Sequence, residues 1–516
     1  MKQPQRLALH PLLRSGAVLQ RERPLRIAGW CPPGSGVRVE LVRLDSRGQR
    51  FAEHTRAAAD GSWAVWLRAQ PAGGEWRLTV EAGMLRTVLV DLRIGDVYLC
   101  GGQSNMEHPY ALSTRAAEDG GRFNDPELRF LRVPLRHVLS PDLAPWDWTT
   151  SPWQTLERPA MDDFSALAAY AGLTLRRLDP DVPIGLVGCY QGATSASCWL
   201  SRASFERHPD FAVYQAEFEE RRAPWRDPSV YQAAAVDYER RAAARHERVM
   251  AYRARHPGAT EAEIDRALGP GPWPPPENED SFLRPCGLYE TMLAPLAGAG
   301  FAAALWYQGE SDAGHAGLYP ALLEAMIADW RALFGELPLL QVQLPAWHPD
   351  PAAADDRSWG RLRAAQRLAS ARIPDTGHIV ALDQGQLENL HPPNKDELGR
   401  RLALHLLDRA ADAYIAAAKW LQNGMVLELT GEVFWDAKQD QDAGDSGFDI
   451  RTGDGWRTLP RSAVTVGRRS IRVAWEEAGV EELCYGGRNA SPATLLTPGG
   501  GALEAAGFLR ADGGER

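Results

Sequence analysis

The sequence predicts an α/β protein with a central parallel sheet and β-rich segments on both sides of it. Continuous apolar runs at 183–188 and 301–306 are typical of parallel strands that are buried on both faces. Short alternating segments separated by Pro-Gly, Asp-Gly and Gly-Gly turns fill residues 1–95, and β signals return after about residue 410. A chain of 516 residues that is 44% hydrophobic is long enough for two or three domains.

We therefore expect three parts along the chain. Residues 1–95 are predicted to form an N-terminal β-sandwich module, because their strands are short and alternate apolar with polar positions. Residues 96–410 are predicted to form the α/β domain, since strand patterns there alternate with helical ones. Residues 411–516 are predicted to form a C-terminal β module.

Residues 201–268 differ from the rest of the α/β domain. They are rich in Ala, Arg and Glu, and Phe211, Tyr214 and Phe218 recur at helical spacing, which predicts a helical insertion. We interpret its charges as solvated helix faces rather than as a substrate-binding cap. The Pro-rich run at 269–276 is a stiff connector back to the core.

Charge and composition narrow the class of partner. The formal net charge of −10 argues against a nucleic-acid or anionic-membrane surface, because both require clustered positive charge, so we expect neither partner. The six cysteines are scattered without a C-x-x-C pair and are predicted to be buried thiols. We expect no metal and no cofactor. The composition leaves the oligomeric state undetermined.

The first residues lack the pattern of a signal peptide. Their apolar run is interrupted by His10 and Pro11, and no small-residue cleavage site follows. A cytoplasmic location is therefore expected for the chain as given. A periplasmic or secreted location is expected if the N-terminus is incomplete.

Ser104 is the first candidate for chemistry. The apolar run at 97–100 predicts a buried strand, and the Gly101-Gly102 pair allows a sharp turn at its carboxyl end. Reactive groups in open α/β sheets lie at the carboxyl ends of the strands. A serine in such a turn also serves as a helix N-cap, so a nucleophilic role requires partners elsewhere in the chain.

His391 is the candidate base, because two prolines fix its loop just before a predicted helix. The orienting carboxylate stays open between Glu388, three residues earlier, and Asp383, at the end of a predicted strand. A Ser–His dyad assisted only by a backbone carbonyl is the third alternative. For the oxyanion hole we expect the backbone at Ser104, the Gly192 N–H and the Gln308 side-chain amide.

Three blocks around Ser104, Gln308 and His391, in this order, resemble the sialate O-acetylesterase family, a branch of the SGNH (GDSL-like) hydrolases. The blocks are Gly102-Gln103-Ser104-Asn105-Met106, Trp306-Tyr307-Gln308-Gly309-Glu310-Ser311 and His391-Pro392-Pro393-Asn394-Lys395. Flanking segments such as Asp60-Gly61-Ser62-Trp63 and Gly447-Phe448 extend the similarity over nearly the whole chain. Two stretches depart from the family pattern: Gln191-Gly192-Ala193-Thr194 stands for Trp-Gly-Gly-Thr, and Glu388-Asn389-Leu390-His391 for a segment ending in Asp-Ile-His.

The resemblance implies a flavodoxin-like α/β/α core and the hydrolysis of O-acetyl esters on sugars, without a metal or organic cofactor. It also implies that Ser104 is the nucleophile and His391 the base. The substrate stays open between 9-O-acetylated sialic acid and acetylated plant glycans.

Two other functions compete with this one. A lipase or esterase of the α/β-hydrolase type requires G-x-S-x-G, but Met106 stands at the second glycine position. A non-catalytic carbohydrate-binding protein is the alternative from another class, because 18 tryptophans offer stacking surfaces for sugars.

Overall fold

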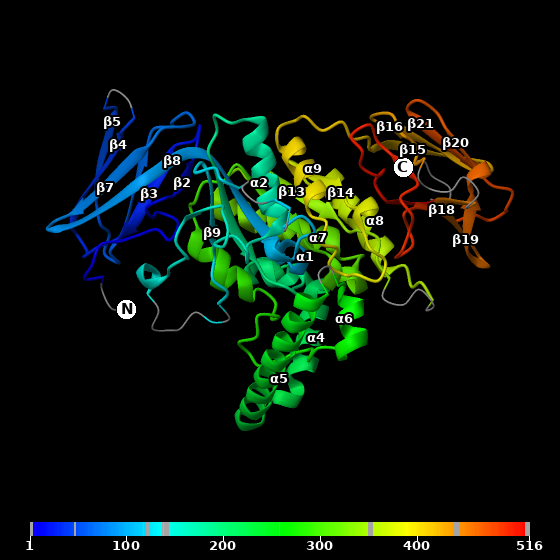
Figure 1. The fold of residues 1–516 in the computed structure, drawn as a ribbon, viewed down its shortest axis with the longest axis horizontal. Helices are drawn as coiled ribbons and strands as arrows, with labels where there is room; N and C mark the ends of the chain where they lie inside the picture. The colour runs from blue at the N-terminus through cyan, green and yellow to red at the C-terminus, as the bar shows by residue number, and fades with distance from the viewer. Residues whose placement is uncertain are drawn as a thin grey trace.

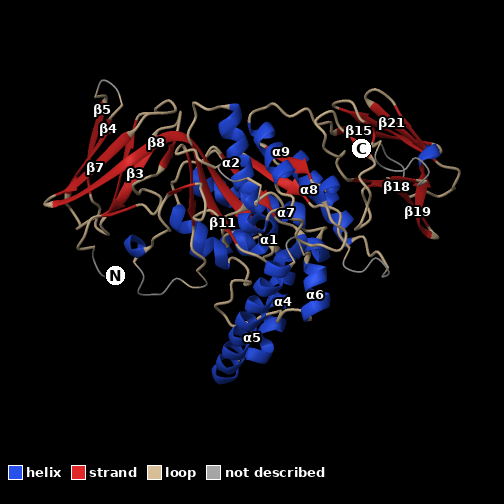
Figure 2. Ribbon diagram, in the orientation of Figure 1, coloured by secondary structure: helices blue, strands red, loops and turns tan. Residues whose placement is uncertain are grey.

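The computed structural model describes residues 4–45, 48–116, 118–119, 123–136, 138, 144–256, 259–348, 354–437 and 444–510. It is a mixed α/β structure with several sheets. Figure 1 shows a helix-containing centre between two β-rich regions, with helices α4, α5 and α6 projecting away from it. Figure 2 shows the same division by type of element, with strands at both ends of the molecule and most helices in between.

The N-terminal β region is built from two groups of strands. One is a three-stranded sheet in the order β1-β3-β6, and the other pairs β4 with β5 and β7, and β7 with β8. The strands are β1 (Ala8–Leu9), β2 (Val18–Gln20), β3 (Leu25–Trp30), β4 (Gly36–Arg43), β5 (Arg50–Arg56), β6 (Ser62–Leu67), β7 (Trp76–Ala82) and β8 (Leu85–Gly102). All of the predicted alternating segments lie on these strands.

Strand β8 joins the N-terminal β region to the central sheet without a break. Its first half pairs antiparallel with β7, and its second half pairs in parallel with the strands of the central sheet. The expected boundary at residues 95 and 96 therefore falls inside a strand. The buried residues of both regions also form one continuous hydrophobic cluster.

The central sheet has the strand order β10-β9-β11-β8-β12-β13-β14. All neighbours pair in parallel except β10, which is antiparallel to β9. Every residue of β11 and β12 is buried, as the continuous apolar runs predicted. The strands after β8 are β9 (Leu128–Arg132), β10 (Gln154–Thr155), β11 (Ile184–Tyr190), β12 (Ala303–Tyr307), β13 (Leu339–Gln343) and β14 (Thr376–Val380).

Helices follow several of these strands and pack in pairs. Helix α2 packs against α9, and α7 packs against α8. The helices of the central part are α1 (Ser104–Glu107), α2 (Ala166–Leu178), α7 (Tyr319–Phe334), α8 (Ser358–Arg372) and α9 (Asp396–Leu406).

Residues 202–268, which we call the helical arm, project from the centre (Figure 1). The arm holds α3 (Arg202–Glu206), α4 (Ala212–Arg222), α5 (Pro228–Arg255) and α6 (Glu261–Leu268). Phe211, Tyr214 and Phe218, the aromatic residues at helical spacing, are all buried. By contrast, α5 has no buried residue along its 28 positions, so most of the arm is a solvated surface.

The C-terminal β region has two four-stranded sheets and one short strand pair. Its buried residues form a second hydrophobic cluster, together with Ala346, Val380 and Leu382 of the central part. The strands are β15 (Ile415–Leu421), β16 (Gly424–Leu429), β17 (Phe434–Trp435), β18 (Asp445–Thr452), β19 (Gly455–Pro460), β20 (Val464–Val466), β21 (Ser470–Ala474), β22 (Glu482–Tyr485), β23 (Leu495–Leu496) and β24 (Ala506–Leu509).

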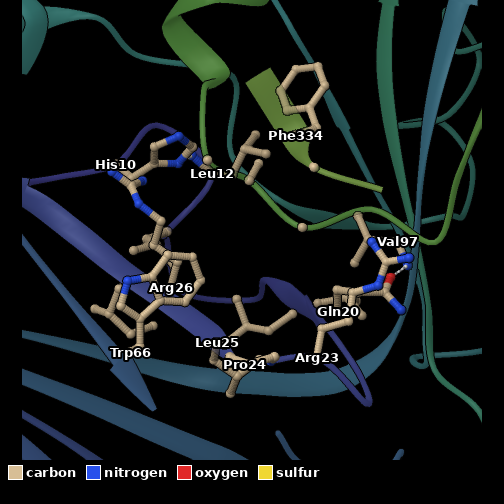
Figure 3. A pocket seen from close by; sticks show the side chains of 18 of the residues that line it. His10, Leu12, Gln20, Arg23, Pro24, Leu25, Arg26, Trp66, Val97 and Phe334 are labelled. Carbon is tan, nitrogen blue, oxygen red and sulfur yellow. Dashed lines mark hydrogen bonds between the residues drawn. The ribbon is translucent and has the colours of Figure 1, made fainter. Parts of the chain in front are cut away.

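A cavity of about 500 Å³ lies at the junction of the N-terminal β region with the centre. Figure 3 shows that Leu25 and Trp66 from the first and Phe334 at the end of α7 surround it. It shares no lining residue with the cavity at Ser104. Among the described helices, none combines the length and the apolar character that crossing a bilayer requires. All six cysteines are buried free thiols, as predicted.

Candidate active site

The turn after β8 places Ser104 at the carboxyl edge of the central sheet. Gly102 ends the strand at a φ of +137°, and a Cβ at this position would lie 2.1 Å from the Tyr307 carbonyl oxygen, so only glycine fits here. The chain then enters α1, whose first residue is Ser104. The predicted strand and turn are therefore both present. They sit between β11 and β12, in the middle of the sheet.

His391 approaches Ser104 from the loop between β14, the last strand in the sheet order, and α9. Its Nε2 lies 2.7 Å from the Ser104 Oγ, although the two residues are 287 positions apart. The loop before α9 carries the imidazole, and the His391 backbone N–H donates to the Asn389 side chain at 3.2 Å. The structure thus brings together the two residues that the sequence singled out as nucleophile and base.

The carboxylate beside His391 is Glu261, from the helical arm. Both of its oxygens lie 2.8 Å from the His391 Nδ1. A carboxylate only accepts hydrogen bonds, so Nδ1 carries the proton and Nε2 is free to accept from the Ser104 hydroxyl. Burial raises the pKa of the Glu261 carboxyl, but the hydrogen bond and charge of His391 lower it by more, so the pKa lies below its ordinary value.

The prediction that Glu388 contacts His391 is wrong. Glu388 is exposed and lies 3.4 Å from the Arg266 guanidinium on α6. Asp383, the second alternative, is held by Arg401 at 2.8 Å. Closeness in sequence favoured Glu388, but α6 approaches the histidine from the side and occupies the position at Nδ1.

Sequence reasoning missed Glu261 because it lies 130 positions from His391 and outside every recognised block. One local signal is present. Thr260 and Glu263 form a capping box, the T-x-x-E pattern that marks a helix start. The pattern identifies Glu261 as the first residue of α6, but it does not reveal what the helix start faces.

A buried polar network links the two loops that carry Ser104 and His391. The Asn105 amide donates to the Glu310 carboxylate at 2.6 Å and to the Leu390 carbonyl at 3.0 Å, and Lys395 Nζ donates to the Asn105 side-chain oxygen at 2.6 Å. Burial lowers the pKa of the Lys395 ammonium to about 7, although the nearby carboxylates act in the opposite direction. Burial also raises the pKa of the Glu310 carboxyl.

The two predicted oxyanion donors differ in their surroundings. Gly192 lies against the nucleophile, since a Cβ added there would be 3.5 Å from the Ser104 Cβ. Its N–H already donates to Glu107 Oε2 at 2.7 Å. Gln308 is fully buried, and its amide donates to the Thr194 carbonyl and to Asp312. Both amide hydrogens are thus engaged, so the expected role of this side chain as an oxyanion donor is corrected: the amide supports the loop.

Ser104, His391 and Glu261 line one cavity of about 850 Å³. Charged groups from three elements also line it, namely Glu107 on α1, Arg132 on β9 and Arg253 on α5. The helical arm therefore forms part of its wall. Across the described ranges, no cluster of three or more His, Cys, Asp or Glu side chains is arranged to hold a metal ion.

The chain is similar to several known proteins. A family model described as carbohydrate esterase, sialic acid-specific acetylesterase matches residues 279–408. The sialate O-acetylesterase of Rattus norvegicus is 23% identical over 421 residues, which cover 75% of this chain and 70% of that protein. The sialate O-acetylesterase of Homo sapiens is 23% identical over 425 residues, covering 76% and 69%.

A solved structure extends the similarity to the fold. The crystal structure of a carbohydrate acetylesterase from Xanthomonas citri is 24% identical, with a TM-score of 0.73 over 97% of this chain and 99% of that one. At this identity the match speaks for the fold alone. The chain is thus similar to the sialate O-acetylesterases over about three quarters of its length, and the family model and the curated relatives support the activity of a carboxylic ester hydrolase.

Proposed function

We propose that the protein removes O-acetyl groups from sugars through an acetyl-Ser104 intermediate. The observation that carries the proposal is the continuous hydrogen-bonded chain from Ser104 Oγ to His391 Nε2 and from His391 Nδ1 to Glu261. A nucleophile, a base and an orienting carboxylate in this order are the groups that serine catalysis requires. A non-catalytic sugar-binding protein has no need of such a chain.

In the acylation step, Ser104 Oγ attacks the acetyl carbonyl carbon while His391 Nε2 takes the hydroxyl proton. Glu261 stabilises the imidazolium that forms and keeps the Nδ1 proton in place. The backbone N–H groups of Ser104 and Gly192 are the proposed donors to the oxyanion. His391 then returns the proton to the departing sugar oxygen.

In the deacylation step, water takes the place of the sugar. His391 accepts a proton from the water as its oxygen attacks the acetyl-enzyme, and Ser104 leaves as the protonated hydroxyl. Acetate and free enzyme result. No step requires a metal or an organic cofactor.

The finer features of the fold enter as part of the same proposal. We infer a flavodoxin-like core of the SGNH type, supported by the parallel order β9-β11-β8-β12-β13-β14 and by the serine after the first core strand. We also propose that the β regions before and after the core are the β modules expected at 1–95 and 411–516. The helical arm corresponds to the expected insertion.

Two measurements on the intact chain test the proposed function. A fluorophosphonate should label Ser104, and acetate should be released from an acetylated sugar. Ser104→Ala should abolish labelling and lower acetate release by about 10³-fold or more, with an unchanged melting temperature. Activity of the variant within about tenfold of wild type would refute the serine mechanism. Comparing acetate release from 9-O-acetylated sialic acid and from acetylated xylan fragments decides between the two substrate classes.

A further inference from the structure

The Glu107 carboxylate accepts the hydrogen bond of the Gly192 N–H, which is one of the two donors proposed for the oxyanion. Its Oε2 accepts the Gly192 N–H at 2.7 Å, and a Cβ at Gly192 would lie 3.1 Å from the same oxygen and 3.5 Å from the Ser104 Cβ. Glu107 stands three residues after Ser104 on α1, and both line the same cavity. The proposed oxyanion hole therefore already contains a negatively charged acceptor.

This arrangement conflicts with the charge that the reaction develops. The carbonyl oxygen of the acetyl group becomes an oxyanion beside the Gly192 N–H, and an ionised carboxylate in that position repels it. The N–H has one hydrogen, so it serves either Glu107 or the oxyanion at full strength. Glu107 must move away before the oxyanion forms.

The structure supplies a second partner for the displaced carboxylate. Arg132, at the end of β9, donates to Glu107 Oε1 at 2.8 Å, and its guanidinium lies over the Tyr190 ring, 5.4 Å from the ring centre. Tyr190 ends β11, two residues before Gly192. The Glu107 side chain is only 27% exposed. When its carboxylate leaves the Gly192 N–H, the ion pair with Arg132 therefore keeps the partly buried charge compensated.

We propose that Glu107 is a positioning residue that holds the Gly192 N–H in the free enzyme and rotates onto Arg132 alone when an acetyl group binds. The inference rests on the proposed function. It adds a step to that function, because each turnover begins with displacement of a resident acceptor from the oxyanion hole. Arg132 acts through Glu107 and does not touch the reacting atoms.

The test measures kcat and KM for 4-nitrophenyl acetate with Glu107→Ala, Arg132→Met and the double variant. Glu107→Ala empties the hole and should raise kcat by about tenfold, with a smaller change in KM. Arg132→Met leaves Glu107 with Gly192 as its partner and should lower kcat by about tenfold. In the double variant the Arg132 change should have no further effect, so its kcat should match that of Glu107→Ala.

A second readout reports on the hole itself. Methylboronic acid forms a tetrahedral adduct with the serine and places a negatively charged group at the acyl position, so its Ki should fall in Glu107→Ala by about the same factor as kcat rises. Glu107→Gln keeps the shape of the side chain and removes its charge. It should change kcat in the same direction, which covers the case in which the alanine variant folds poorly.

Other outcomes overturn the inference. A kcat that falls tenfold in both Glu107→Ala and Glu107→Gln, at unchanged melting temperature, would show that the carboxylate assists the reaction from where it lies. An Arg132→Met effect that persists in the double variant would show that Arg132 does not act through Glu107. Failure of the proposed function is distinct, because then Ser104 would resist fluorophosphonate labelling in the wild type and in all variants.

Discussion

The proposed catalytic chain of Ser104, His391 and Glu261 crosses two regions that are built in different ways. Ser104 stands at the edge of the central sheet between β11 and β12, whose residues are all buried, and His391 meets it from the loop between β14 and α9. Glu261 comes from the helical arm, whose longest helix buries none of its 28 residues. The Glu261 side chain is itself 43% exposed, against 19% for His391.

The difference indicates that the proposed nucleophile and base are held by packing, whereas the proposed orienting carboxylate is held by a few contacts of a surface element. On α6 these are the buried Ile264 side chain and the ion pair of Asp265 with Arg245, which joins α6 to α5 within the arm. An exposed pair between Arg266 and Glu388 adds little, because solvent screens such charges. The geometry of His391 therefore depends on how firmly the arm docks.

The sharpest way to test this comparison is to neutralise the carboxylate on the arm. Glu261→Gln should lower kcat by roughly 10²–10⁴-fold, because an amide nitrogen facing Nδ1 stabilises the wrong imidazole tautomer. Steady-state acetate release at pH 7 to 8 measures the effect.

Glu388→Gln is the matched control, since it removes the same charge three residues before His391 from a side chain that pairs with Arg266. It should stay within about twofold of wild type. A large loss in Glu388→Gln together with an active Glu261→Gln would return the orienting role to the sheet edge.

The stability of the buried central part should depend on pH through Lys395. Burial lowers its pKa to about 7. The unfolded chain, with an ordinary lysine pKa, then binds one more proton than the folded protein between about pH 7 and pH 10, so the stability of the fold rises with pH in that window. Below about pH 7 both states are protonated, and the cost of burying the charge is present in full.

Lys395→Met removes this titration. The free energy of unfolding of wild type should gain about 3–4 kcal/mol relative to the variant between pH 7 and pH 10. Urea denaturation at both pH values measures the difference. Parallel pH profiles for the two proteins would show that Lys395 titrates as it does in water.

The smallest effect is expected from loosening the arm without touching its carboxylate. Ile264→Ala removes the buried contact of α6 and should lower kcat by about tenfold, because Glu261 then samples positions away from His391. Val230→Ala on exposed α5 is the control and should leave kcat unchanged. An Ile264→Ala enzyme with wild-type kcat would show that the arm is held by other contacts.

The sequence contained enough to predict the half of the site that lies on the sheet. Apolar runs, the Gly101-Gly102 turn and the loop before α9 all follow local rules, and the ordered blocks linked Ser104 to His391. Glu261 did not follow from any local rule, since its role depends on the direction in which the arm leaves the core. The engaged state of the Gln308 amide was equally hidden, because Asp312 competes for it four residues further on.

The boundary expected near residue 95 falls inside strand β8 for a related reason. A change of pattern from alternating to continuously apolar marks a change in what covers a strand, and it does not mark the end of that strand. The first part of β8 pairs with β7 and is partly exposed, and its last part is a fully buried strand of the central sheet, so one strand carries both patterns.

The shared strand also sets an order for folding during synthesis. The first half of β8 has its partner β7 available as soon as it leaves the ribosome, but the second half pairs with β11 and with β12, which ends only at Tyr307. At ordinary elongation rates, roughly 10–40 s pass before that last partner exists. During this interval the second half of β8 is an apolar strand whose backbone N–H and C=O groups still lack the partners that β11 and β12 will supply. The N-terminal region beside it is already able to fold. The strand that carries Ser104 at its end is thus prone to aggregation during synthesis until its last partner has been made.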